Sequence, residues 1–216
     1  MAAGPSDAPM NEIIQPPLPC QPVPQAPRRR RLVLRTVVTV LAVGAGVFFG
    51  RRAVNAAFGA PDDSGRYRLT PPATFQGLTL QDSGPRVEAI KEGQGARKPG
   101  TEPVAVVYAD QGGTARLVVS GVSGAFTDGD PGAELTESIH AMGVNGAATQ
   151  DSGTPAGGSM RCGTLTTGAG PLTLCTWADH SSLVTVTVPV ENEPVTFEAL
   201  AGHTRALRAA MEVPKA

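Results

Sequence analysis

An apolar run bordered by arginines constrains the fold of this chain more than any other sequence feature. The run extends from Leu32 to Gly50, and its stretch from Thr36 onward has no charged residue. A helix rises about 1.5 Å per residue, so the run comes close to crossing a hydrocarbon core roughly 30 Å thick. Seven arginines lie within or beside it: Arg28, Arg29, Arg30, Arg31, Arg35, Arg51 and Arg52. The pattern predicts a transmembrane helix over residues 32–52.

The distribution of these arginines predicts the orientation of the helix. Five precede the uncharged stretch and two follow it. Arg35 lies one turn inside the run, where its long side chain can extend to the lipid headgroups. The excess of positive charge before the run places the N-terminus in the cytoplasm. We therefore expect a protein of the plasma membrane, with residues 53–216 on the extracytoplasmic side and the lipid bilayer as its first partner.

Two further features of the apolar run allow other interpretations. Residues 30–35 resemble a twin-arginine export signal, with Arg29 where that pattern has Ser or Thr, and a cleavage site, although a poor one, could lie after Gly59. Arg51 and Arg52 border the run directly and argue against cleavage, so a secreted soluble protein is the alternative. Gly46 and Gly50 have the spacing of a helix-pairing motif that could form a homodimer, although glycine is also simply tolerated in membrane helices.

The remainder of the N-terminal region indicates a tail without a core. Met1–Pro27 contains eight prolines and few large apolar residues, so residues 1–31 form a predicted disordered cytoplasmic tail rich in Pro and Arg. Cys20 has no assigned role there. Residues 53–216 carry eleven Lys and Arg against seventeen Asp and Glu. This acidic balance excludes nucleic acid as a partner, because phosphate binding needs clustered bases.

Residues beyond the apolar run divide into a predicted stalk and entry segment, 53–101, and a domain, 102–216. Alternating β-branched residues predict five strands, and helical spacing predicts two helices. The strands are 104–109, 115–122, 160–167, 171–178 and 183–189; the helices are 131–142 and 195–213, with a Gly-rich loop over 144–159. The order β-β-α-β-β-β-α predicts an α+β fold, an antiparallel sheet with two helices covering one face.

Cys162 and Cys175 are the only cysteines in the distal region. If Gly168 and Ala169 form a two-residue type II′ turn, the two cysteines lie directly opposite each other on neighbouring strands. Facing residues have Cα atoms about 4.5 to 5.5 Å apart, which suits a disulfide bond. Free thiols and half of a metal site are the alternatives. Zinc requires four ligands, and none of the three histidines lies near these cysteines at zinc-site spacing.

A resemblance emerges from the residues around these cysteines. Met160-Arg-Cys162-Gly, followed by Leu174-Cys175-Thr-Trp177-Ala-Asp179, resembles a group of uncharacterised actinobacterial proteins with one membrane segment and an exported C-terminal domain. The resemblance extends over most of residues 28–211. It implies the same topology and the same Cys162–Cys175 bond, and it brings no assigned activity.

No catalytic constellation is visible in the sequence. Asp179-His180-Ser181 contains an acid, a base and a nucleophile, but side chains adjacent on a strand point apart, so a turn explains it better. Walker, dinucleotide-binding and HExxH motifs are absent from the sequence.

We expect a protein that is not an enzyme and has no cofactor or metal. It would bind an envelope protein or ligand, with Trp177 and Asp179 as a candidate surface. An envelope hydrolase, in which Asp179 converges with Asp110 or Glu137, is a further alternative.

Overall fold

The computed structural model describes residues 63–126 and 130–216. The predicted tail, the predicted membrane helix with its seven arginines, Gly46, Gly50 and Cys20 all lie outside the described residues. Among the helices of the described ranges, none combines the length and the apolar character needed to span a bilayer.

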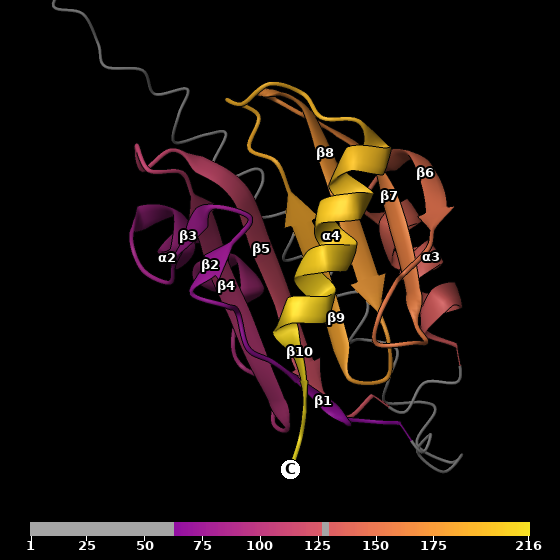
Figure 1. The fold of residues 1–216 in the computed structure, drawn as a ribbon. Coiled ribbons are helices and arrows are strands. Elements are labelled where there is room, and N and C mark those ends of the chain that lie inside the picture. The colour runs from indigo at the N-terminus through magenta and orange to yellow at the C-terminus, as the bar shows by residue number, and fades with distance from the viewer. Residues whose placement is uncertain (1–62, 127–129) are drawn as a thin grey trace, which may run out of the picture.

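The described residues form an α+β fold with three helices and an antiparallel sheet (Figure 1). The helices are α2 (Pro85–Gln94), α3 (Pro131–Ala141) and α4 (Phe197–Met211). The eight strands of the sheet have the spatial order β2-β3-β4-β5-β9-β8-β7-β6. Their bounds are β2 Thr74–Phe75, β3 Leu78–Gln81, β4 Thr101–Ala109, β5 Ala115–Gly124, β6 Val144–Gln150, β7 Ser159–Thr167, β8 Gly170–Ala178 and β9 Ser182–Thr187.

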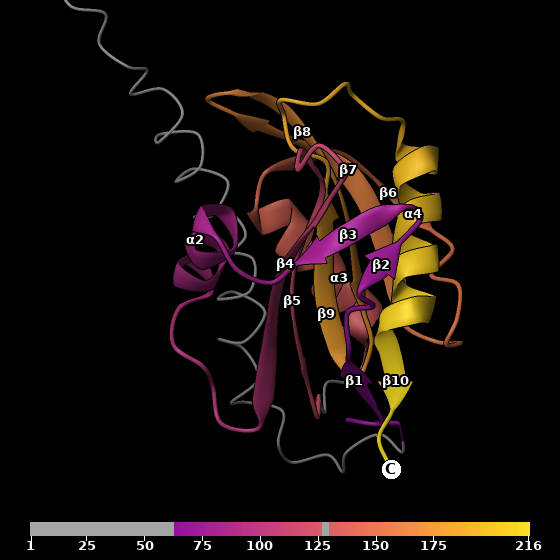
Figure 2. The same ribbon diagram turned by 60° about the vertical axis from the view of Figure 1, so that its left-hand side comes forward.

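The helices cover both faces of the sheet, and the prediction of two helices on one face is therefore wrong. Helix α4 lies on one face, while α2 and α3 lie on the other (Figures 1 and 2). The central strands require this arrangement, because neighbouring residues such as Leu174 and Cys175 are both buried and point to opposite faces. Leu174 packs in the cluster that contains Leu135 of α3, and Cys175 packs in the cluster that contains Leu200 of α4.

Strand β6 occupies one edge of the sheet, where the sequence predicted a loop. It consists of small and polar residues that are mostly exposed, so it has no apolar alternation. Its pairing with β7 also contains a bulge between Asn145 and Ala148. Gly163 of β7 lies against this bulge, and a Cβ atom there would lie 2.5 Å from Val144 Cγ1. The absence of a side chain at Gly163 lets the bulged strand approach.

Much of the segment assigned to the stalk belongs to the folded unit. Strands β2 and β3 extend the sheet beyond β4, and α2 packs Val87 and Ile90 against it. A separate two-stranded sheet pairs β1 (Tyr67–Leu69) with β10 (Glu212–Pro214), the last strand of the chain. Strand β1, through which the chain enters the domain, is therefore paired with β10 at the C-terminal end of the domain.

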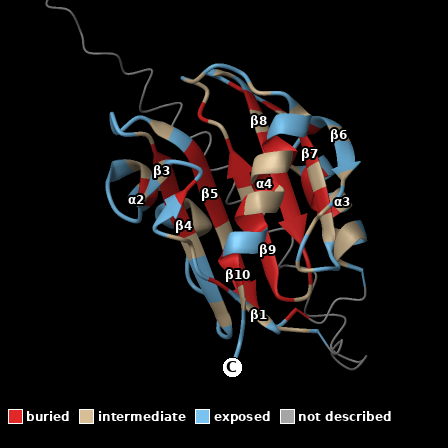
Figure 3. Ribbon diagram, viewed as in Figure 1, coloured by how far each residue is buried: buried red, intermediate tan, exposed pale blue. Residues whose placement is uncertain are grey.

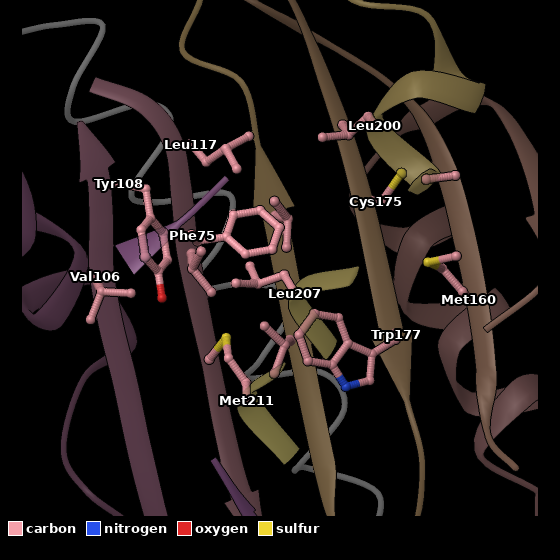
Figure 4. Packing of buried hydrophobic residues seen from close by; sticks show 14 of the residues in the cluster. Phe75, Val106, Tyr108, Leu117, Met160, Cys175, Trp177, Leu200, Leu207 and Met211 are labelled. Carbon is pink, nitrogen blue, oxygen red and sulfur yellow. The ribbon is translucent and has the colours of Figure 1, made fainter. Parts of the chain in front are cut away.

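The main core lies between the sheet and α4 (Figures 3 and 4). The inner stripe of α4 consists of Leu200, Thr204, Leu207 and Met211, which are all fully buried. Trp177 on β8 and Tyr108 on β4 contribute the largest side chains from the sheet. Burial raises the pKa of Tyr108 to about 12, and its hydroxyl donates to the carbonyl of Pro72 at 3.0 Å.

Candidate functional site

The predicted pairing of Cys162 with Cys175 is confirmed. The two residues are directly opposite each other on β7 and β8, their Cα atoms are 4.0 Å apart, and their sulfur atoms are bonded. Both side chains are fully buried beneath α4. Gly168 and Ala169 form the two-residue connection, but the positive φ belongs to Gly170, so the turn is not type II′. The register was predicted correctly from an incorrect turn type.

Removal of the disulfide should weaken the domain. We expect the double variant Cys162→Ala, Cys175→Ala to lose about 3 kcal/mol in its free energy of unfolding, because the bond closes a short loop in the unfolded chain. Urea unfolding followed by circular dichroism measures this loss. Cys20→Ser is the matched control, and its midpoint should be unchanged. A reduced wild-type protein as stable as the oxidised one would contradict the expectation.

The predicted turn at Asp179-His180-Ser181 is confirmed between β8 and β9. Asp179 Oδ1 accepts hydrogen bonds from the backbone N–H groups of Ser181 at 2.6 Å and Ser182 at 2.7 Å. The three side chains do not converge on one another. His180 Nδ1 lies 2.7 Å from Asp63 Oδ1, and Ser181 Oγ donates to the Asp63 carbonyl. The turn therefore holds the segment through which the chain enters the domain.

The second oxygen of Asp179 belongs to a buried ionic cluster. Arg208 of α4, which is 1% exposed, donates from Nη2 to Asp179 Oδ2 at 2.8 Å and from Nε to Glu212 Oε2 at 2.9 Å. Its Nη1 donates to the carbonyls of Ser152 at 3.1 Å and Gly157 at 3.0 Å. We call Asp179, Arg208 and Glu212 the carboxylate cluster.

Glu212, the first residue of β10, supplies the second carboxyl group of this cluster. Its Oε1 accepts a hydrogen bond from the indole Nε1 of Trp177 at 2.8 Å and a short one from the hydroxyl of Ser182. Burial, followed by the charge of Asp179, raises the pKa of Glu212 to about 7, against the opposing effect of Arg208. The two carboxyl groups and the one cation of the cluster thus lie beside an indole, in a site closed to solvent.

Two sequence-based assignments need correction. Trp177 and Asp179 cannot form a binding surface, because Trp177 is 0% exposed and Asp179 is 7% exposed. Asp110 does not converge with Asp179, since it lies in the β4–β5 turn and pairs with Arg116. Hydrogen bonds from Thr114 and Arg116 hold the pKa of Asp110 below its ordinary value. Glu137, the other suggested partner, is exposed on α3.

Sequence reasoning missed Arg208 and Glu212 as the partners of Asp179. A signal existed, because Arg208 and Glu212 are four residues apart and each follows a residue of the apolar stripe, Leu207 or Met211. Charged residues at those positions lie on the buried side of α4 or at its border. This placement predicts a buried ion pair between Arg208 and Glu212 that needs a further polar partner from another element.

The surface has an apolar groove at the end of the domain opposite β1 and β10. Two adjacent hollows of about 550 and 640 Å³ flank the segment 188–197, which connects β9 to α4. Val188 and Val195 line both hollows; Phe197 and Pro171 line the first, and Leu78 and Leu117 line the second. We call the two hollows together the distal groove.

The polar side chains of the distal groove are mostly engaged within the protein. Glu191 pairs with Arg86, and Arg116 pairs with Asp110. The amide of Asn192 donates to the carbonyl of Ala115 at 2.7 Å, which fixes the connecting segment on β5. Within the described part of the chain, Glu193 lines both hollows and has no ion pair. It leaves one free negative charge in an apolar groove.

No family model matches this chain, and a comparison with curated proteins gives no match. In residues 63–126 and 130–216, no three His, Cys, Asp or Glu side chains are grouped in a way that could hold a metal ion. The described part of the chain offers two candidate sites, the distal groove and the carboxylate cluster.

Proposed function

We propose that this protein is a single-pass membrane protein whose extracytoplasmic α+β domain binds a partner at the cell envelope without catalysing a reaction. The distal groove is the observation that carries the proposal, because it is an open hollow with apolar walls on the described surface of the domain. The carboxylate cluster supports a binding role over a catalytic one, since its polar atoms are engaged inside the protein. The Cys162–Cys175 bond agrees with an oxidising compartment.

The location of the distal groove fits an anchored protein. The chain enters the domain at Asp63–Leu69, and β1 and β10 lie together at that end (Figure 1). The connection from β9 to α4 passes over the opposite end. A membrane helix that precedes residue 63 would thus hold the entry end toward the bilayer and direct the distal groove away from it.

The chemistry of the distal groove indicates an extended peptide segment with apolar side chains and one basic residue. Its walls are Val, Leu, Pro and Phe side chains, which bind apolar groups. Glu193 supplies a free carboxylate, and residues 53–216 have an excess of acidic side chains. A cationic partner would be attracted to such a surface.

The proposed topology is tested by the intact mass of the protein in washed membranes and in the medium, with and without reduction before alkylation. A full-length chain in the membrane that gains two alkyl groups only on reduction, beyond that on Cys20, supports an anchored, disulfide-bonded domain. A chain in the medium that begins near Ala60 would contradict the anchor and establish a secreted protein.

The proposed binding is tested with a library of random eight-residue peptides presented to the full chain in detergent. We expect selected peptides to be apolar with one Lys or Arg. Val195→Asp should weaken their binding at least tenfold, and Glu193→Gln should weaken it severalfold by removing the charge. Glu88→Gln on α2 is the matched control, because Glu88 pairs with Lys91 outside the groove. Peptides that bind both groove variants and the control equally would contradict the assignment.

A further inference from the structure

The carboxylate cluster lies where the two ends of the domain are joined. Glu212 is directly opposite Leu69 in the β1–β10 ladder. Two further backbone hydrogen bonds extend this contact, from Thr70 N–H to the Met211 carbonyl at 2.8 Å and from Lys215 N–H to the Arg66 carbonyl at 2.9 Å. The side chain of Glu212 also ties β10 to the interior, through its contacts with Arg208 and Trp177. A change in the charge of Glu212 therefore also affects how firmly β1 is held against β10.

The cluster has more acid than base. Arg208 supplies one positive charge, whereas Asp179 and Glu212 supply two negative charges when both are ionised. The side chains of Arg208 and Glu212 are 1% and 0% exposed, so water cannot compensate the difference. An uncompensated charge in a protein interior is costly. A proton shared by the two carboxyl groups removes this charge and leaves the cluster neutral.

The charged groups that face Glu212 are known from each element packed around it. Helix α4 contributes Arg208, and the β8–β9 turn contributes Asp179. Strands β8 and β9 contribute Trp177 and Ser182, both neutral donors, and β1 places the apolar Leu69 opposite. In the described chain, the balance of charge at Glu212 is therefore set by one cation and one anion.

We propose that Asp179, Arg208 and Glu212 form a proton-operated clasp on the entry strand β1. The clasp is closed when Asp179 and Glu212 share a proton and loosens when both are ionised. The proposal is independent of the partner that the distal groove binds.

The direction of the pH dependence follows from the pKa of Glu212, which folding raises from an ordinary value of 4.5 to about 7. A raised pKa stabilises the folded state below the unfolded value, and this contribution is lost as the pH rises through the folded value. The clasp is therefore closed at pH 5.5 and loosened at pH 8.5. If β1 detaches to release the cluster, its opening equilibrium changes roughly 30-fold between these two pH values.

The chain contains one tryptophan, Trp177, and its indole N–H donates to Glu212. Tryptophan emission of the full-length protein in detergent thus reports directly on the cluster. We expect a transition in emission with a midpoint near neutral pH. Hydrogen exchange, expressed as protection factors to remove the intrinsic pH effect, should show β1 and β10 losing protection over the same range. The β4–β5 hairpin should change less than twofold.

Two variants distinguish the protonation of the carboxylate cluster from the titration of other groups. Asp179→Asn removes the competing anion and leaves Glu212 beside Arg208, so the emission transition should move to lower pH. Histidine side chains ordinarily titrate near neutrality, and His180→Gln removes the one that contacts Asp63. It should keep the transition and the loss of protection.

Each outcome decides the proposal. Protection of β1 that does not change with pH in the wild-type protein overturns it, as does a transition abolished by His180→Gln. A folded Asp179→Asn protein that keeps the neutral transition also overturns it. If Asp179→Asn does not fold, the wild-type and His180→Gln proteins decide the proposal. In both, hydrogen exchange must show a selective loss of protection at β1 and β10 as the pH rises.

Discussion

Arg208→Leu should lower the free energy of unfolding at pH 7 by about 3 to 5 kcal/mol, because it leaves two buried carboxyl groups without their cation. The substitution also removes the donors to the carbonyls of Ser152 and Gly157, which lie in the loop between β6 and β7. Urea unfolding followed by circular dichroism measures the effect. The loss should be smaller at pH 5, where protonation neutralises more of the remaining acid.

Arg205→Leu provides the matched control on the same helix. Arg205 is partly exposed, and its hydrogen bond to the Asp151 carbonyl is long, at 3.4 Å. We expect a change within about 0.5 kcal/mol, as for surface substitutions generally. If the two variants are equally stable at pH 7, Arg208 does not hold a buried cluster.

Trp177→Ala should lower the free energy of unfolding by about 3 to 5 kcal/mol, the range for large aromatic side chains removed from a core. Trp177 is fully buried between β8 and α4, close to Leu207 and Met211 (Figure 4). The variant has no tryptophan, so circular dichroism again provides the measurement.

Trp177→Phe separates packing from hydrogen bonding. It keeps most of the apolar volume but leaves Glu212 Oε1 without the indole donor, for an expected loss of about 1 to 3 kcal/mol. The Phe variant should thus lie between wild type and Trp177→Ala. An Ala variant no less stable than the Phe variant would show that Trp177 contributes only its hydrogen bond.

The parts of the fold that the sequence predicts best are those with local signals. The β4–β5 hairpin has two β-branched runs around Asp110–Gly113, and its strands are confirmed. The β7–β8 register follows from counting outward from Gly168 and Ala169 until the two cysteines meet. Asp130 accepts hydrogen bonds from the N–H groups of Gly132 and Ala133 at the start of α3, as an N-cap followed by proline indicates.

The parts that could not be predicted depend on tertiary contacts. Strands β1, β2 and β10 contain two or three residues each, too few for any periodicity. They are extended because a neighbouring strand supplies hydrogen bonds. The placement of helices on both faces is visible only when Val106 and Val107, adjacent on β4, are recognised as members of two different clusters.

The buried site illustrates the same limit at single residues. Asp179, Arg208 and Glu212 come from a turn, a helix and a terminal strand, and Asp179 is 29 residues from Arg208. The sequence around Asp179 is typical of a turn, and Asp179 does lie in a turn. Its second carboxyl oxygen has a partner that only the packing of α4 against β8 brings into reach.

The β1–β10 ladder also has a consequence for engineering. Tyr67 is directly opposite Pro214, so the two ends of the fold could be joined by a short peptide and the chain reopened elsewhere. The exposed turn at Gly112 and Gly113 is a suitable new opening, because it would preserve every strand pair. A circular permutant of this kind would move the point of attachment to another part of the surface and reorient the domain without altering its interior.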